Sequence, residues 1–196
     1  MSTAVNSFIS SVKSICPEMS EEDLSFFESK LFMKTYRRKE VYLEAGEIQT
    51  SIGFVAEGLV RSYYVDQNGD EINTGFYSEG NYATHYASYL NQKPSSYSIQ
   101  CLEPTVLVGF TFKDHQMLYQ HSENFERYGR RITEAILIQQ QERIESFVFD
   151  SAEKRYLDFI EKNKLLFNRI SISQLSSYLG IERQSLTRIR QKLAHH

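Results

Sequence analysis

The stretch "SISQLSSYLGIERQSLTRIRQKLAHH", residues 171–196, has the pattern of two short helices that meet at a glycine. Ser171 and Gln174 have the spacing of a capping box, which opens a helix. Gly180 permits a sharp turn after it. Apolar residues then recur every three or four positions, at Leu175, Tyr178 and Leu179 in the first helix and at Leu186, Ile189 and Leu193 in the second. This layout is typical of a helix-turn-helix.

The face of the second helix opposite its apolar stripe is polar and basic. Arg binds guanine and Gln binds adenine through paired hydrogen bonds in the major groove, whereas hydroxyl and ammonium groups serve phosphates. A solvated basic face is the simpler reading, but the cap, the glycine and the apolar stripe together favour DNA binding. We expect double-stranded DNA to be bound by Ser171, Arg183, Gln184, Ser185, Thr187, Arg188 and Lys192.

The charge of the chain is divided unequally. From Ser151 onward there are nine Lys and Arg against four Asp and Glu, a net of +5. The whole chain carries −3, which leaves −8 on the first 150 residues. A basic end on an acidic body indicates a polyanion-binding module attached to a part with another task.

Residues 40–112 read as β structure. Short runs such as "EVYLE", "EINTGFY" and "TVLVGFTF" alternate with turn signals such as "QNGD" and "QKPSS". This density of strands and glycine turns predicts a β sandwich or barrel. A capped helix over residues 20–33 precedes it, behind Ser20. The expected fold class is α+β, with an N-terminal β sandwich or barrel, a long helix and a C-terminal all-α helix-turn-helix.

A helix of about 30 residues is predicted between 122 and 150. One of its stripes, through Phe125, Tyr128 and Ile132, suits the core of its own domain, while Leu137, Ile144, Phe147 and Val148 continue on a neighbouring face. We expect this second face to pair with a second copy in a homodimer, although periodicity alone also allows a helix that lies wholly on its own body. A further amphipathic helix is predicted over residues 151–167. The expected domains are 1–121, 122–150 and 151–196.

These residues together resemble the Crp/Fnr family of transcription regulators, in particular its compact Bacteroidetes-type members. The resemblance rests on "EAGE", "VAEG" and "SEGNY" in the β region and on "DSAEKRYLDFIEKN" and "SQLSSYLGIERQSLTRIRQKLA" near the end. It implies an N-terminal β jelly roll that is a cyclic-nucleotide-binding-type sensor, a dimerising helix and a helix-turn-helix, with Arg183, Gln184 and Arg188 at base-contacting positions. Phosphate contacts from a β-hairpin after the second helix are expected to be absent.

The segment "GNYATHYASYLNQKPSSYSIQ", residues 80–100, departs from the cyclic-AMP-binding members. Where those members have a Glu for the ribose and an Arg for the phosphate, this chain has His85 and the pair Ser95 and Ser96. A buried phosphate without an Arg loses a charge-assisted contact, so cyclic AMP is not the expected effector. The pocket residues, which either line a site for an unknown effector or fill it, are Tyr82, Thr84, His85, Ser95, Ser96 and Gln139. A true cyclic-nucleotide responder, with Lys93, Gln139 or Arg143 replacing the lost groups, remains an alternative.

No cofactor, metal site or enzymatic activity is expected. Two cysteines, Cys16 and Cys101, cannot ligate a four-thiolate cluster, and they are either buried thiols or one disulfide. A cupin-type enzyme is the alternative from another class, but the five histidines show no closely spaced pair in the strands. Without a membrane-length apolar run or a signal peptide, a cytoplasmic protein is expected.

Overall fold

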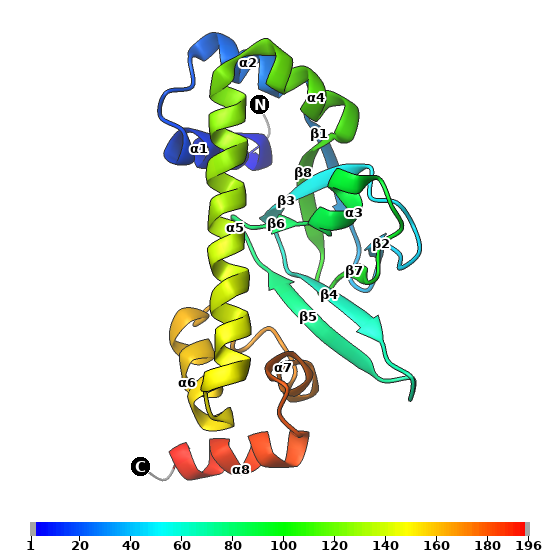
Figure 1. Cartoon of the computed structure of the whole chain (residues 1–196), viewed down its shortest axis with the longest axis vertical. Coiled ribbons are helices and arrows are strands. Elements are labelled where there is room, and N and C mark those ends of the chain that lie inside the picture. The colour runs from blue at the N-terminus through cyan, green and yellow to red at the C-terminus, as the bar shows by residue number, and fades with distance from the viewer. Residues whose placement is uncertain (1–2, 195–196) are drawn as a thin grey trace. The chain divides into compact units, whose positions relative to one another are not determined.

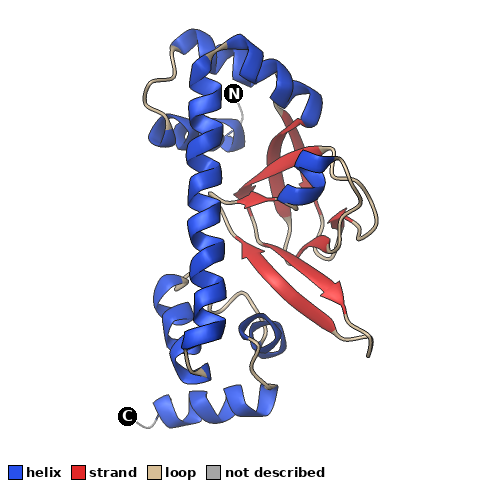
Figure 2. Ribbon diagram, in the orientation of Figure 1, coloured by secondary structure: helices blue, strands red, loops and turns tan. Residues whose placement is uncertain are grey.

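The computed structural model describes residues 3–194, which divide into two compact units. The first unit comprises the chain up to Ser62 together with Phe76–Ala135. The second comprises Tyr63–Gly75 and the chain from Ile136 onward. Figure 1 labels the elements of both units and colours them in chain order, and Figure 2 distinguishes the helices from the strands.

Two helices open the first unit. Helix α1 spans Thr3–Ile15 and was not predicted, whereas α2 spans Glu21–Glu28 behind the predicted cap. The side chain of Ser20 accepts a hydrogen bond from the backbone N–H of Asp23, and the Asp23 carboxylate accepts one from the N–H of Ser20. The prediction that this helix continues to residue 33 was wrong, because residues from Phe32 onward pair with a strand far along the chain.

The predicted β region forms two four-stranded sheets, in the orders β1-β8-β3-β6 and β2-β7-β4-β5. Antiparallel pairs join strands distant in sequence, as where Phe32 of β1 lies opposite Gly109 of β8. The α+β class with a two-sheet N-terminal β domain is therefore confirmed. The strands are β1 Phe32–Tyr36, β2 Val41–Leu43, β3 Ser51–Glu57, β4 Val60–Val65, β5 Glu71–Tyr77, β6 Tyr82–Ala83, β7 Ser98–Cys101 and β8 Thr105–Thr111.

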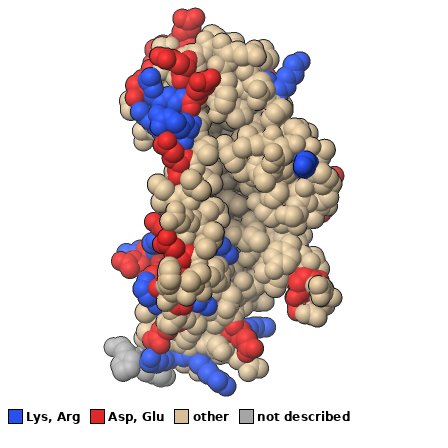
Figure 3. Space-filling view, in the orientation of Figure 1, with Lys and Arg blue, Asp and Glu red and all other residues tan. Residues whose placement is uncertain are grey.

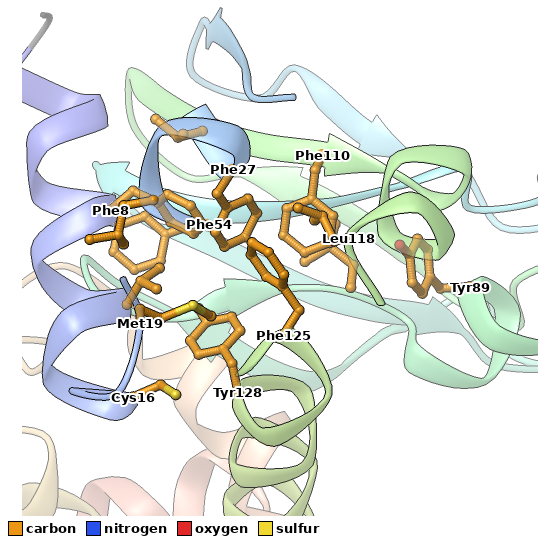
Figure 4. Packing of buried hydrophobic residues seen from close by; sticks show 14 residues of the cluster. Phe8, Cys16, Met19, Phe27, Phe54, Tyr89, Phe110, Leu118, Phe125 and Tyr128 are labelled. Atoms are coloured by element: carbon orange, nitrogen blue, oxygen red, sulfur yellow. The ribbon is translucent and has the colours of Figure 1, made fainter. Parts of the chain in front are cut away.

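Three helices complete the first unit: α3 Tyr86–Asn91, α4 Phe112–His121 and the start of α5 Glu123–Phe149. The predicted long helix is thus confirmed. Its first stripe is buried, since Phe125 and Tyr128 are 1% and 5% exposed. Phe125 meets Phe27 of α2 edge-on, and Phe27 meets Phe8 of α1 in the same way, with ring centroids 5.3 and 5.2 Å apart (Figure 4). Aromatic contacts of this kind join α1, α2 and α5 into one core.

The second unit contains the C-terminal helices α6 Ala152–Lys162, α7 Ile172–Leu179 and α8 Arg183–Ala194. Helix α6 begins behind Ser151, whose side chain accepts from the N–H of Lys154, and it ends five residues before the predicted residue 167. Tyr156 and Phe159 of α6 are buried. Leu157 of the same helix is 43% exposed.

Cys16 and Cys101 are both free and buried, so the disulfide alternative does not hold in this structure. Burial raises the pKa of each thiol. Within residues 3–194, no group of three or more His, Cys, Asp and Glu side chains could hold a metal ion. In the same part of the chain, no helix combines the length and apolar composition that crossing a bilayer requires.

Candidate nucleic-acid interface and sensor cassette

Helices α7 and α8 form the predicted helix-turn-helix. The Ser171 hydroxyl accepts from the N–H of Gln174 at 3.2 Å, and the Gln174 side chain accepts from the N–H of Ser171 at 2.9 Å. Gly180 ends α7 in the left-handed conformation with φ +62°. Leu186 is fully buried and anchors α8 on the helices beside it. The capping box and the glycine turn therefore act as the sequence indicated.

The polar face of α8 is open to solvent. Arg183, Gln184 and Arg188 are exposed, and Ser185 and Thr187 are half-buried. On the face drawn in Figure 3, Lys and Arg side chains lie along α8. A row of guanidinium and carboxamide groups on a helix held by a buried leucine has the donors and acceptors that base edges require.

Lys192 is exposed but is not a free cation. Its ammonium group lies 3.0 Å from the carboxylate of Glu153 on α6. Arg190 lies with its guanidinium carbon 5.1 Å from the centre of the Phe167 ring. A carboxylate beside Lys192 lowers the positive potential there. Lys192 therefore attracts a phosphate less strongly than an unpaired ammonium group would.

The second stripe of α5 is exposed in the single chain. Leu137, Ile144 and Val148 are 65%, 64% and 67% exposed and are separated by seven and four residues. This is the heptad spacing of residues that interdigitate between paired helices. Isolated exposed leucines are ordinary on protein surfaces, but a row at this spacing marks an interaction surface.

Two of the predicted pocket residues, Thr84 and His85, are hydrogen-bonded to Gln49, a residue that no sequence motif marked. Its side-chain oxygen accepts from the backbone N–H of His85 at 2.6 Å and from the hydroxyl of Thr84 at 3.4 Å. The backbone N–H of Gln49 donates to the hydroxyl of Ser88 at 3.0 Å. Gln49 is 2% exposed, so a neutral amide occupies the interior of the cassette, which we define as residues 80–100.

The ring of His85 is fixed by two neighbours. Its Nδ1 accepts from the N–H of Ser88 at 3.1 Å, which places the proton of the neutral ring on Nε2, 3.3 Å from the Ser96 hydroxyl. Burial lowers the pKa of His85, so the neutral form is favoured. His85 is therefore a donor toward Ser96 rather than a base. The Ser95 hydroxyl is buried and donates to the carbonyl of Tyr97 at 2.6 Å.

Tyrosine side chains are packed in and beside the cassette, and their hydroxyls are hydrogen-bonded to protein groups. Tyr42 donates to the carbonyl of Ser51 at 2.9 Å, and its ring lies so close to Gly53 that a Cβ there would be 3.3 Å away. Burial raises the pKa of Tyr42 to about 12. Two cassette hydroxyls reach α5, where Tyr82 is hydrogen-bonded to Tyr128 and Tyr86 to Thr133. These hydroxyls are thus satisfied by protein groups.

Three other residues were candidates for the ligand site: Gln139, Lys93 and Arg143. Gln139 is exposed and belongs to the second unit. Lys93 is exposed at the surface of the cassette. The buried Arg61 of β4 donates through Nε and Nη2 to the side-chain oxygen of Gln100 at 3.1 and 2.7 Å. Arg143, considered as a replacement for the lost phosphate ligand, instead donates to the carbonyl of Tyr178 at 3.1 Å.

A polar contact that the sequence did not signal lies within the second unit. Asn73 of β5 is 3% exposed, and its side-chain amide donates to the Ser177 hydroxyl of α7 at 2.7 Å. The backbone N–H of Asn73 donates to the same hydroxyl at 3.2 Å. An Asn in a strand and a Ser in a helix have no pattern that pairs them before the chain is folded.

One protein-family model and several solved structures are similar to this chain. The family model of the cyclic nucleotide-binding domain matches residues 33–122. Over its length the chain is similar to the structure of FixK2 from Bradyrhizobium japonicum, with TM-score 0.74, 16% identity, and 84% of this chain and 85% of that chain covered. It is also similar to CLP of Xanthomonas campestris, described as a c-di-GMP responsive global regulator, with TM-score 0.70, 14% identity and coverage of 90% and 92%.

The catabolite activator protein of Thermus thermophilus gives TM-score 0.58 at 18% identity, with 92% of this chain and 86% of that chain covered. None of the curated proteins matches the chain in sequence. At identities this low, the likeness establishes a shared fold, and the roles of individual residues rest on the geometry above.

Proposed function

We propose that this chain, which has the fold of the Crp/Fnr-type regulators, is a homodimeric transcription regulator that reads double-stranded DNA with helix α8. The observation that carries the proposal is the build of the terminal helix pair: Leu186 is buried, and Arg183, Gln184 and Arg188 on the same helix are exposed. A helix that presents these groups to solvent has donors and acceptors that suit base edges in the major groove.

Dimerisation is part of the proposal because one recognition helix covers only a few base pairs. Two copies joined through the exposed stripe of α5 would present two α8 helices to two half-sites of a palindrome. The stripe of Leu137, Ile144 and Val148 supports this arrangement, since pairing with a second copy would bury three side chains that are now in water.

The sensor is proposed to be degenerate toward cyclic nucleotides. Residues 80–100 contain no arginine, and the interior is occupied by the neutral Gln49 and by tyrosines with protein partners. A cyclic phosphate buried there would lack a cation to offset its desolvation. The effector is therefore another small molecule or none, and the role is regulatory rather than catalytic.

Selection from a random DNA library followed by binding across a salt series tests the DNA-binding proposal. We expect enrichment of a palindromic site, bound with an affinity that falls steeply as salt rises. Arg183→Ala and Arg188→Ala should each relax preference at one base position by roughly 1–3 kcal/mol, while Lys192→Ala should weaken binding to all sequences evenly. A purified protein that enriches no sequence would contradict the proposal.

Calorimetric titration with cyclic AMP and cyclic GMP tests the sensor separately. We expect no heat of binding, because residues 80–100 contain no arginine to pair with the cyclic phosphate. Saturable binding of either nucleotide would favour a true cyclic-nucleotide responder, with the same DNA-binding helix.

A further inference from the structure

The end of helix α7 has more carbonyl groups than its turn can satisfy. In the turn, the N–H of Gly180 donates to the carbonyl of Ser177 at 3.3 Å, and the N–H of Ile181 donates to that of Ser176 at 3.0 Å. This is the Schellman arrangement, in which N–H groups of the turn bond to carbonyls of the last helical turn, and the carbonyls of Tyr178, Leu179 and Gly180 follow.

Arginines from two other helices donate hydrogen bonds to the carbonyls at this turn. Arg155 of α6 donates through Nε to the carbonyl of Leu179 at 3.0 Å and through Nη2 to that of Gly180 at 3.5 Å. Its Nη1 donates to the carbonyl of Asp150 at 2.8 Å, at the junction before α6. All three nitrogens of this guanidinium group are thus engaged by backbone carbonyls.

Arg143 of α5 completes the arrangement. Its Nη2 donates to the carbonyl of Tyr178 at 3.1 Å, and its guanidinium carbon lies 3.9 Å from the centre of the Tyr178 ring. Phe147 lies one turn further along α5, with its ring centre 5.1 Å from the guanidinium carbon of Arg143 and 5.3 Å from that of Arg155. Two cations therefore flank one aromatic ring at the negative end of the α7 dipole.

The ring of Phe147 also touches the turn. A Cβ on Gly180 would lie 2.8 Å from Cε1 of Phe147, closer than side chains approach one another. Since the same residues satisfy the carbonyls and cover the glycine, the path of the chain from α7 into α8 is held by groups on α5 and α6.

We propose that Arg143, Phe147 and Arg155, here called the turn clamp, are positioning residues that set the orientation of α8 for reading base edges. This inference rests on the proposed DNA-binding function and adds residues that do not themselves contact DNA. The alternative, that the two arginines bind phosphates, would require the guanidinium group of Arg155 to give up three backbone carbonyls.

Amide hydrogen exchange on the full-length protein without DNA tests the clamp directly. In Arg155→Ala, exchange at the amides of Gly180 and Ile181 should become roughly tenfold faster, because carbonyls at the turn lose a charged donor. Arg155→Lys should remain close to Arg155→Ala, since one ammonium cannot reach three carbonyls. Lys162→Ala, which removes an exposed cation from the same helix, is the matched control and should leave exchange unchanged.

Binding to the DNA site enriched by the wild-type protein supplies the functional readout. In Arg155→Ala and Arg143→Ala, the ratio of specific to non-specific affinity should fall by roughly tenfold, while the slope of affinity against salt stays the same. A slope that falls by about one in either variant would assign that arginine to a phosphate and overturn the proposal. If Arg155→Ala does not fold, Arg143→Ala and Arg155→Lys carry the same test.

Unchanged exchange at the turn in Arg155→Ala, or full restoration by Arg155→Lys, would also overturn the clamp. These results are distinct from a failure of the proposed function, in which the wild-type protein enriches no DNA. The exchange measurement decides the clamp in either case, because it needs no DNA.

Discussion

Replacing Gly180 by Ala tests how closely the turn of the helix-turn-helix is packed. Gly180 has φ +62°, a conformation that costs an L-residue about 1–2 kcal/mol. The new methyl group would also lie 2.8 Å from Phe147, and overpacking of this kind adds about 1–3 kcal/mol. We therefore expect Gly180→Ala to lower the free energy of unfolding of the second unit by roughly 2–5 kcal/mol.

Gly69 offers a matched control in the same unit. It has φ +87°, and a Cβ there would meet no heavy atom within 4 Å. Gly69→Ala should thus incur the backbone cost alone, about 1–2 kcal/mol. The difference between the two variants isolates the contact with Phe147, and in the double variant Phe147→Ala with Gly180→Ala this excess should largely disappear.

Hydrogen exchange at the buried amides of α7 and α8 measures the loss of stability that these variants cause in the second unit. It reports the opening free energy of the second unit even if the two units unfold separately. Thermal unfolding followed by circular dichroism should agree, with a loss of roughly 8–40 °C for Gly180→Ala in a unit of this size. If Gly180→Ala costs no more than Gly69→Ala, the close approach of Phe147 to the turn is refuted.

Three further predictions concern the dimer, the acid response and the charge beside α8. Ile144→Glu places a charge on the exposed stripe of α5, so the protein should sediment as a monomer. Burial lowers the pKa of His115 to about 4, against 6.5 in the unfolded chain, so the unfolded state binds more protons between these values. The contribution of His115 to the free energy of unfolding of the first unit should be fully present above pH 6.5 and fall by about 3 kcal/mol as the pH drops toward 4. In denaturant titrations, His115→Asn should lack this pH-dependent contribution. Glu153→Gln removes the carboxylate beside Lys192 and should steepen the salt dependence of DNA binding by up to about one phosphate contact.

Each of these predictions has a control and a result that would contradict it. Gln139→Glu, at an exposed position of α5 on the face opposite Leu137 and Ile144, should leave the dimer intact, and a dimeric Ile144→Glu would remove the stripe from the interface. His121 is exposed on the same helix as His115, so His121→Asn should keep the acid response. If Glu153→Gln binds DNA with the wild-type salt slope, Lys192 does not reach a phosphate.

Local signals explain why the terminal helices could be predicted closely. The Ser171 and Gln174 capping box, Gly180 and the stripe through Leu186 each act over three or four residues, where helical geometry dictates which side chains meet. The helix cap at Ser20 was predicted for the same reason. The end of that helix was not, because the pairing of Phe32 with Gly109 depends on a strand about 75 residues away.

The cassette shows the limit of reasoning from local pattern. The absence of an arginine between residues 80 and 100 is visible in the letters alone and argues against a cyclic phosphate. The occupant of the space is not visible, because Gln49 comes from a distant segment and has no helical or strand periodicity that points it toward His85. Arg155 is similar: its place in an amphipathic helix was predictable, and its three carbonyl partners were not.

The sequence by itself therefore predicted the α+β class, the β region, the long helix and the two C-terminal helices, since these follow from periodicity, caps and turn residues. Tertiary structure alone decided that Gln49 is hydrogen-bonded to His85 and that arginines of α5 and α6 donate to the turn before α8. The physical reason is that a buried polar group must find a partner wherever the fold brings one, and that partner lies at no fixed distance along the chain.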